Sequence, residues 1–283
     1  MKGAWLVALL FCARPALADG PHVLGHFTTG YATDADHKAR ASNVELAAEA
    51  IDRKVIAPGA TFSFNDAVGE RTAAFGFAKA TVLRDGMLAE GTGGGTCQVA
   101  STLHAAALLA GLEIVHRAPH SRPSAYIRMG LDATVVFGTI DLKIKNPGTE
   151  LVTIVVHRGK GTLDVALESV APKPAVTLTS EIVERTAFAN TYERDRSIED
   201  EKIHVHAFGI PGFRVRRLRI VDGHADVRTD TYAPVNAVLR VATVADAVTS
   251  TEEPVASVVD PEAVKPALVQ ARPSTLVTLD NAR

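Results

Sequence analysis

Cys97 stands in a sequence context that could activate a thiol. Three consecutive glycines and Thr96 precede it, and the run from Val99 to Ala110 behind it is rich in alanine and leucine with helical periodicity. This order predicts a glycine loop that leads into a helix, with Thr96 as the N-cap and Cys97 in the first turn. The positive end of the helix dipole favours a thiolate there, which predicts a lowered pKa and a nucleophile for acyl transfer.

The same loop supplies groups that could bind a substrate. Glycines let the backbone approach a ligand closely and direct several N–H groups to one point, where an oxyanion could be held. The candidate oxyanion and substrate-binding residues are Gly93, Gly94, Gly95, Thr96, Gln98 and, from a later loop, Ser121. The alternative is a structural cysteine packed where the helix meets a sheet, but the glycine loop favours the nucleophile.

A thiolate that transfers acyl groups needs a base, which is usually a histidine. His104 lies two helical turns from Cys97, about 10.5 Å along the axis, so we interpret it as a packing residue. His116 and His120 flank Pro119 near the start of a loop, and a loop histidine reaches a helix N-terminus more readily. We therefore predict His120 as the base.

A third residue should orient the imidazole. Asp132 follows His120 closely and gives the chain order Cys, His, Asp of a catalytic triad. Asp141 is the rival, but it alternates with Lys143 and Lys145 along a strand, which favours a solvated role. We therefore predict Asp132 as the orienting residue.

The histidines form no recognisable metal-binding pattern. His116 and His120 are four residues apart, but a proline lies between them, and the sequence contains no HExxH motif. His204 and His206 share one face of a strand without an evident third ligand. We expect neither a metal nor another cofactor. The formal net charge is −2, and loss of Lys2 and Arg14 with residues 1–18 would make it −4, which gives no electrostatic reason to expect nucleic-acid binding.

Residues 1–18 have the features of a secretory signal peptide. Lys2 precedes an apolar run from Ala4 to Cys12, and the small residues Ala16 and Ala18 predict cleavage after Ala18. The apolar run, about nine residues, is too short to span a membrane, and no later stretch is long enough. We therefore expect a periplasmic or secreted protein without a transmembrane segment. Cleavage leaves Cys97 as a lone thiol in an oxidising compartment.

The segments around these residues predict an α+β domain over residues 22–170. Apolar residues between Ala41 and Lys54 recur with helical spacing, and Asp85-Gly86 is typical of a hairpin turn after a strand at residues 80–84. Further segments with strand character cover residues 60–64, 112–115, 134–137, 139–145 and 151–157. We expect the helix that carries Cys97 to pack against this sheet.

A β-rich appendage is predicted over residues 175–245. Short β-type runs occur at residues 202–208, 212–221 and 237–243. Four arginines, Arg214, Arg216, Arg217 and Arg219, lie in one of these runs, and we interpret them as a charged strand face rather than a polymer-binding site. Residues 246–283 are rich in Pro, Ser, Thr, Glu and Ala and contain no aromatic residue, which predicts a disordered tail.

Collinear motifs along residues 27–156 resemble those of the VanW-like family. They are Phe27-Thr-Thr-Gly30, Pro58-Gly-Ala-Thr-Phe-Ser-Phe-Asn65, Val68-Gly69, Gly93-Gly-Gly-Thr-Cys-Gln98, Ser101-Thr-Leu103, Leu108-Leu-Ala-Gly-Leu-Glu113, Pro119-His-Ser121, Asp132-Ala-Thr134 and Asp141-Leu-Lys143. Thr229-Asp-Thr-Tyr-Ala-Pro234 resembles, more loosely, a region that often follows this domain. The resemblance implies a VanW-like catalytic domain followed by the β-rich appendage; the helix that carries Cys97 and the choice of Asp132 come from the residue pattern and not from the family.

The resemblance also implies a function in the cell wall. The family takes its name from accessory proteins of vancomycin-resistance clusters, and some members are regarded as cysteine-dependent L,D-transpeptidases that form 3-3 cross-links in peptidoglycan. By this resemblance Cys97 is the nucleophile, and His120 matches the histidine of the Pro-His-Ser motif. The family often has a histidine where this chain has Ala118 and an acidic residue where it has His116, so we assign catalysis to neither position.

These observations predict an exported acyltransferase that acts on peptidoglycan stem peptides. Cys97 would attack a peptide carbonyl, and an amine from a neighbouring stem would resolve the thioester. If water resolves it, the same site is an L,D-carboxypeptidase or endopeptidase; the sequence does not separate these activities, because acceptor choice depends on the shape of the pocket. The alternative class is a non-catalytic envelope-binding or scaffold protein in which Cys97 is merely buried.

Overall fold

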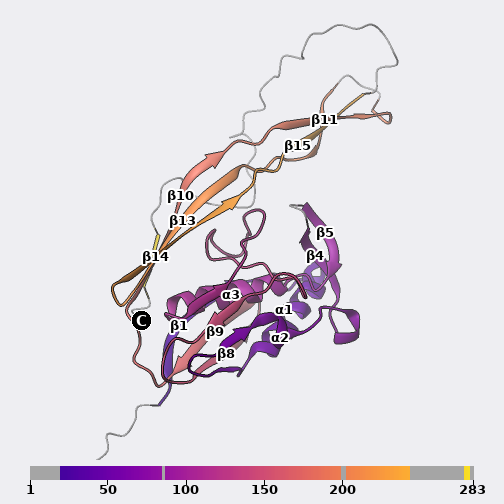
Figure 1. Cartoon of the computed structure of the whole chain (residues 1–283). Coiled ribbons are helices and arrows are strands. Elements are labelled where there is room, and N and C mark those ends of the chain that lie inside the picture. Colours follow the sequence, from indigo (N-terminus) through magenta and orange to yellow (C-terminus); the bar gives the residue numbers. More distant parts are fainter. Residues whose placement is uncertain (1–19, 85–86, 199–201, 243–276, 281–283) are drawn as a thin grey trace, which may run out of the picture.

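The computed structural model describes residues 20–84, 87–198, 202–242 and 277–280. The signal peptide expected over residues 1–18 lies outside this part of the chain. The described residues are mostly β-strand with a few helices, which confirms the α+β class in its broad form. Figure 1 shows a region that contains the labelled α-helices and a long β-sheet arm that rises from it. Within the described residues, no helix is both long and apolar enough to cross a membrane.

An antiparallel sheet underlies the helices. Its strands, in spatial order, are β1 (His22–Gly30), β9 (Thr162–Ser169), β8 (Val152–Gly159) and β2 (Val55–Ile56). The helix α3 (Thr96–Leu109) packs against β1 and β9, and α1 (Lys38–Ile51) packs beside α3 (Figure 1). Gly25 of β1 permits this close approach, because a Cβ there would lie 2.4 Å from the backbone nitrogen of Ala110.

The helix α3 is almost entirely internal. Each of its residues is buried except Cys97, which is half-buried. Val99 and Leu103 pack into the main core with the sheet, while Leu108 joins a second cluster that includes Leu178 of the arm. Burying apolar surface on all sides fixes the helix in place. Cys97 is therefore where this rigid element reaches the surface.

Shorter elements complete the helical region. The strands β3 (Thr61–Ser63), β7 (Lys143–Lys145) and β6 (Glu113–His116) form a small sheet, and β4 (Lys79–Arg84) pairs with β5 (Met87–Thr92) as an antiparallel hairpin. The turn residues expected at 85 and 86 lie outside the described residues. The 3₁₀ helices η1 (Ala35–His37) and η2 (Ala73–Phe75) lie in the connections. The short helix α2 (Phe64–Val68) begins directly after β3, because the Ser63 hydroxyl accepts the N–H of Asp66 at 3.1 Å.

Several local predictions need correction. Residues 134–137 and 139–142 do not form strands; Ala118 bridges to Thr134, and Val136 bridges to Ile140 across a tight turn. The helix expected over residues 41–54 ends at Ile51, because Arg53 has a positive φ of 57° that no helix accommodates. The strands β1 and β9 were not predicted from the sequence.

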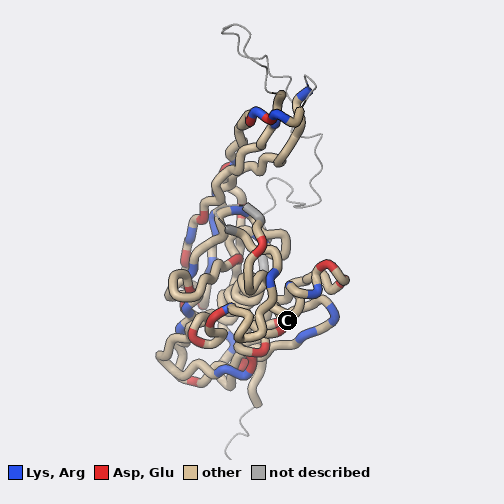
Figure 2. Tube along the Cα trace, turned by 90° about the vertical axis from the view of Figure 1, so that its right-hand side faces the viewer, with Lys and Arg blue, Asp and Glu red and all other residues tan. Residues whose placement is uncertain are grey.

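Two further sheets form the arm. The first contains, in order, β14 (His224–Tyr232), β13 (Gly212–Val221), β10 (Val176–Thr186) and β16 (Val277–Asp280), and the second contains β11 (Asn190–Asp195), β15 (Ala237–Ala242) and β12 (His204–Ala207). Asp222 and Gly223 both have positive φ and make the two-residue turn from β13 to β14. Acidic and basic residues are interspersed along the described chain (Figure 2).

The arginines of β13 do not form one solvated face. Arg214 and Arg216 are exposed and pair with glutamates of β10, whereas Arg217 is buried and Arg219 is half-buried. Successive side chains of a strand point to opposite faces, so the run is divided between solvent and interior. The interpretation as a charged strand face is therefore wrong for Arg217 and Arg219.

The expected disordered tail over residues 246–283 differs from the structure at one point. Val277–Asp280 form β16, which pairs antiparallel with Thr177–Ser180 at the edge of β10. The segment contains valine and threonine, which favour strands. The remainder of the expected tail lies outside the described residues.

Candidate active site

Cys97 lies where the first turn of α3 meets residues 133–135. The N–H of Val135 donates to the sulfur at 3.5 Å, and the thiol lies 3.6 Å from the carbonyl oxygen of Val135. One turn further along the helix, the Ser101 hydroxyl lies 2.7 Å from the carbonyl oxygen of Cys97 and accepts the N–H of Ala133 at 2.8 Å. These bonds fix the segment beside the thiol.

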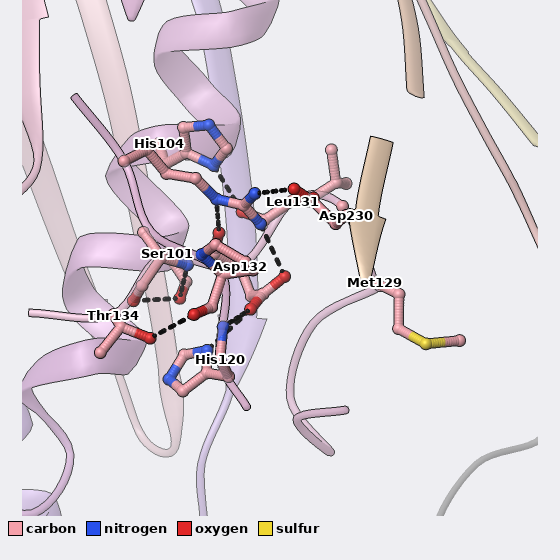
Figure 3. Close-up of polar contacts among 12 residues, drawn as sticks. Ser101, His104, His120, Met129, Leu131, Asp132, Thr134 and Asp230 are labelled. Atoms are coloured by element: carbon pink, nitrogen blue, oxygen red, sulfur yellow. Dashed lines mark hydrogen bonds and ion pairs between the residues drawn. The ribbon is translucent and has the colours of Figure 1, made fainter. Parts of the chain in front are cut away.

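His120 and Asp132 form a buried pair next to this segment. The carboxylate Oδ2 of Asp132 lies 2.8 Å from Nδ1 of His120 and also accepts the backbone N–H of His120 at 2.7 Å (Figure 3). Only 6 % of His120 and 1 % of Asp132 are exposed. Two bonds to one carboxylate oxygen fix both the position of the ring and its tautomer, with Nδ1 as donor and Nε2 directed away from Asp132.

The charges of Cys97 and His120 depend on each other. Burial alone would raise the pKa of the Cys97 thiol, but the hydrogen bond and charge of His120, the N–H of Val135 and the charge of Arg71 outweigh burial and lower it. Burial would lower the pKa of His120, but bonding to Asp132 and Cys97 and their negative charges raise it to about 9. Both shifts favour a thiolate–imidazolium pair at neutral pH.

Asp132 remains ionised despite its burial. Burial would raise its pKa, but the bond to His120 and the charges of Arg117 and His120 hold it well below the usual range. An aspartate that stays anionic can stabilise an imidazolium. Cys97, His120 and Asp132, which we call the reactive site, therefore have the arrangement of a nucleophile, a base and an orienting carboxylate.

Two arginines and a tyrosine surround the reactive site. The Tyr126 hydroxyl lies 3.5 Å from Nε2 of His120, and burial, followed by the charge of Cys97, raises the pKa of Tyr126, which keeps it neutral. The Arg40 guanidinium lies 5.8 Å from the centre of the Tyr126 ring. Arg71 stacks near Phe64 and Phe137 and bonds to Asn65 at 2.7 Å. The arginines add positive charge around a developing thiolate.

The three glycines serve packing more than ligand approach. Cβ atoms at Gly93, Gly94 and Gly95 would lie 2.6 Å from Arg71 Cβ, 2.5 Å from the Thr81 carbonyl oxygen and 2.9 Å from Val44 Cγ2, respectively. Gly93 and Gly95 also have positive φ. Packing therefore explains why no side chain is present at these three positions, and the binding of an oxyanion by their N–H groups stays a prediction.

Thr96 and Gln98 also have roles that differ from those predicted. Gly95, not Thr96, is the N-cap of α3, and the Thr96 hydroxyl donates to the Gly93 carbonyl at 3.0 Å. Gln98 is fully buried; its amide donates to Thr29 and Gly30 of β1 and accepts from Arg40. Both side chains are committed to holding the loop and helix against β1 and α1, so neither is placed to bind a substrate.

The remaining predicted residues are spread around the site. Ser121 is exposed, one residue beyond His120. His116 is exposed and lies 2.6 Å from the Asp141 carbonyl, and His104 is fully buried, 2.7 Å from the Leu131 carbonyl. Asp141 accepts bonds from Ser63 and from the N–H of Asn65. It is half-buried, so its expected solvated role is wrong: it ties β3 to the start of α2.

The described part of the chain contains no cluster of three or more His, Cys, Asp or Glu side chains that could hold an ion. His206 instead lies 3.0 Å from Arg240 on the arm.

Sequence reasoning missed the groups that contact Asp132 from outside the reactive site. They are Arg117, which donates to Asp132 Oδ1 at 2.9 Å, and Tyr232 of β14, whose hydroxyl donates to the same oxygen at 2.5 Å. The signal that could have found Tyr232 is its place in the Thr229–Pro234 motif, which loosely resembles a region that often follows this domain.

Comparisons with known proteins agree on one family. Residues 39–168 match the family model described as VanW like protein. The chain is 41 % identical over 146 residues to the uncharacterised protein YoaR of Bacillus subtilis (strain 168), covering 52 % of this chain and 48 % of YoaR. It is 33 % identical over 109 residues to the vancomycin B-type resistance protein VanW of Enterococcus faecalis (strain ATCC 700802 / V583), covering 37 % of this chain and 40 % of that protein.

Among solved structures, the IgA1 protease G5 domain is 20 % identical and covers 25 % of this chain and 94 % of that domain, with a TM-score of 0.19. The matches to the two curated relatives span less than half the length of each. The family match itself contains Cys97, His120 and Asp132 and ends before the arm begins. This chain therefore contains, over residues 39–168, a region that matches the VanW-like family model.

Proposed function

We propose that this protein is an exported cysteine acyltransferase of the cell envelope that acts on peptidoglycan as an L,D-transpeptidase forming 3-3 cross-links. The observation that carries the proposal is the position of Cys97. It is the partly exposed residue of an otherwise buried helix, and it lies beside an imidazole that a buried aspartate fixes in orientation. A cysteine that served only packing would need neither this imidazole nor the buried aspartate behind it.

The first half of the reaction forms a thioester. The Cys97 thiolate attacks the carbonyl carbon of a donor peptide bond, and a carbon–sulfur bond forms as the carbonyl oxygen becomes an oxyanion. Collapse of this intermediate breaks the carbon–nitrogen bond. The leaving amine takes the proton of the His120 imidazolium, whose raised pKa of about 9 keeps that proton available at neutral pH.

The second half releases the thioester. An amine of a neighbouring stem gives its proton to the now neutral His120 as it attacks the acyl carbon, and a new amide bond replaces the carbon–sulfur bond. The thiolate and imidazolium are restored. One amide is exchanged for another, so the reaction needs no external energy source, which suits a protein outside the cytoplasm.

The backbone offers one clear candidate for holding the oxyanion. At the start of α3, the N–H groups of Thr96 and Gln98 donate to the carbonyls of Gly93 and Gly95, at 3.2 and 3.0 Å. The N–H of Cys97 lies between them in the first helical turn, where N–H groups lack helical partners. We assign it the oxyanion, in place of the wider glycine-loop site expected from the sequence.

The substrate and the location rest on the match of residues 39–168 to the VanW-like family model and on the features of residues 1–18. One relative is named for vancomycin resistance, a property of the cell wall, which supports peptidoglycan stem peptides as substrates. A cleavable signal peptide would deliver the mature chain to the periplasm or outside the cell.

Purified full-length mature protein incubated with muropeptides of defined stem length tests this proposal. We expect a mass increase on Cys97 equal to the acyl portion of the donor, followed by dimers with 3-3 linkages. Cys97→Ala should form neither product, while His116→Ala, which changes an exposed histidine, should form both. Shortened stems without dimers would replace the transpeptidase by a hydrolase, and turnover by Cys97→Ala would refute the covalent mechanism.

A further inference from the structure

The carboxylate of Asp132 receives donors from two separate parts of the chain. Its Oδ2 accepts the backbone N–H and Nδ1 of His120, which belong to the VanW-like domain. Its Oδ1 accepts Arg117 Nη2 at 2.9 Å and the Tyr232 hydroxyl at 2.5 Å. Tyr232 is only 1 % exposed and ends β14 in the arm, a hundred residues along the chain from Asp132.

The same tyrosine also fixes the backbone that leads to Asp132. Its hydroxyl oxygen accepts the N–H of Gly130 at 2.7 Å. From the adjacent strand β13, buried Arg217 donates to the carbonyl of Gly130 at 3.1 Å. The backbone N–H and the carbonyl of Gly130 are therefore both bonded to side chains of the arm and not to the domain that carries Cys97.

Arg117 connects the arm to the site by a second route. Its Nη1 donates to Asp230 of β14 at 2.5 Å, while its Nε donates to the Asp132 carbonyl at 2.6 Å. The side chain of Arg117 is 7 % exposed, and that of Asp230 is 10 % exposed. A buried guanidinium shared by two carboxylates can hold both in fixed positions.

We propose that β14 is part of the reactive site, with Tyr232 and Asp230 as positioning residues that hold Asp132 and, through it, the His120 imidazole. The proposal rests on the proposed function, because it assigns the two residues a role in the same Cys97 chemistry. This proposal also gives the arm a role in the reactive site. The domain over residues 22–170 does not itself contain two of the side chains that complete the site.

Charge explains how each residue would act. Tyr232 donates to the carboxylate and spreads part of its negative charge, so removing the hydroxyl leaves Asp132 a stronger partner for the imidazolium. Asp230 offsets the positive charge of Arg117, so removing that carboxylate exposes His120 to the full guanidinium charge. The first change should raise the pKa of His120, and the second should lower it.

Other titratable and charged groups also lie near Asp132 and His120. His104, whose pKa is held well below its ordinary value by burial and the charges of Arg117 and Arg217, is neutral, and so is Tyr126. Cys97 supplies the negative charge on the other side of the His120 ring, and Arg71 and Arg40 lie near the thiol. None of these groups changes in the variants below.

The test measures the titration of His120 by NMR of its ring protons in the full mature chain. We expect Tyr232→Phe to move the His120 midpoint upward, and Asp230→Asn to move it downward, each on the order of half a pH unit. The controls are Tyr192→Phe on β11 and Glu184→Gln on β10, an exposed tyrosine and an exposed ion-pair partner in the same arm, and neither should move it.

Each outcome bears on the proposal. If both variants fold and titrate as the wild type does, the arm only packs against the domain and the proposal is wrong. If both midpoints fall together toward that of a free histidine, the residues support the fold without tuning the site, which also overturns it. Failure of the proposed function looks different: wild-type Cys97 would then react with iodoacetamide like an ordinary thiol, and muropeptides would remain unchanged.

Discussion

At the scale of single residues, reactivity comes from charges that stabilise one another. A half-buried thiol alone would resist ionisation, and a buried imidazole alone would lose its proton. Together, Cys97 and His120 stabilise the thiolate and the imidazolium. The negative charge of Asp132, whose low pKa comes from His120 and Arg117, supports the imidazolium. The reactive site is thus one coupled unit, and changing any member should alter the titration of the others.

Alkylation of Cys97 by iodoacetamide should follow the lowered pKa of the thiol. The thiolate is the reacting form, and a free thiol has a pKa of about 8.5. The wild-type rate should therefore stay high at pH values below about 8.5. It should fall only when the pH drops through the lowered pKa of Cys97. His120→Ala should move this midpoint upward because it removes the main stabilising partner. Rate–pH profiles of both proteins provide the measurement.

The matched control for this prediction is His116→Ala, since His116 is exposed and its ring lies against the Asp141 carbonyl rather than the thiol. Its profile should overlay that of the wild type. A shift in the His116 variant alone would mean that the wrong histidine has been identified as the base.

Replacing Asp132 by asparagine should affect folding as well as chemistry. Arg117 and protonated His120 would lose the charge that balances them in the interior, which typically costs about 3 to 5 kcal/mol. The His120 midpoint should fall, since burial then dominates its pKa. Urea denaturation and the NMR titration of His120 test the two effects separately. A variant as stable as the wild type would contradict the assigned role of Asp132.

At the scale of elements, α3 and its glycine loop set the position of the thiol. The helix is buried on all sides, and the loop before it fits between α1, β4 and Arg71 with no space for a side chain. Rigid placement of a nucleophile lowers the entropic cost of reaching a productive geometry. The glycines contribute to catalysis indirectly, by letting α3 begin where it does.

Gly94→Ala should therefore destabilise the protein and displace Cys97. The new methyl would lie 2.5 Å from the Thr81 carbonyl oxygen and 3.0 Å from Ala80, backbone that cannot easily move, so a loss on the order of 2 kcal/mol or more is expected. Gly30→Ala is the control, because its Cβ would meet nothing closer than 3.8 Å. Thermal unfolding compares the two, and equal melting temperatures would show that the loop can yield.

At the scale of the whole molecule, the helical region and the arm meet around residues 129–132. Leu178 of β10 packs with Leu108 and Leu131, and Ser180 donates to the Met129 carbonyl at 2.9 Å. Apolar packing and buried polar bonds lie at the same boundary. The arm is therefore anchored at its base, next to Asp132, whereas its far end, with β11 and β15, extends away from the helices (Figure 1).

Ending the chain after Ala242 should have a small cost confined to the arm. The truncation removes β16, which pairs with only four residues at the edge of β10, so we expect a fall in melting temperature of a few degrees, about 2 to 4 °C per kcal/mol lost. Alkylation of Cys97 should keep its wild-type pH profile, because Tyr232 and Asp230 remain. A changed profile would show that the C-terminal residues reach the reactive site.

The sequence by itself determined the local features of this protein. The glycine run, the alanine-rich periodicity and the turn residues predicted a helix behind Cys97, a hairpin after residues 80–84 and the strands β12, β13 and β15 of the arm, because these depend on backbone preferences over a few neighbouring residues. The collinear motifs indicated the VanW-like family for the same reason: they can be recognised without knowing which of them touch.

Only the tertiary structure decided which residues surround the thiol and its base. Gln98 was predicted at the substrate and is instead buried against β1, while Tyr232, a hundred residues from Asp132, donates to its carboxylate. The alternating pattern of residues 134–142 also looked like that of a strand. In the structure these residues form isolated β-bridges and not a continuous ladder of strand pairs. Contacts between distant segments depend on how the sheets and helices pack, and no local pattern in the chain encodes that packing.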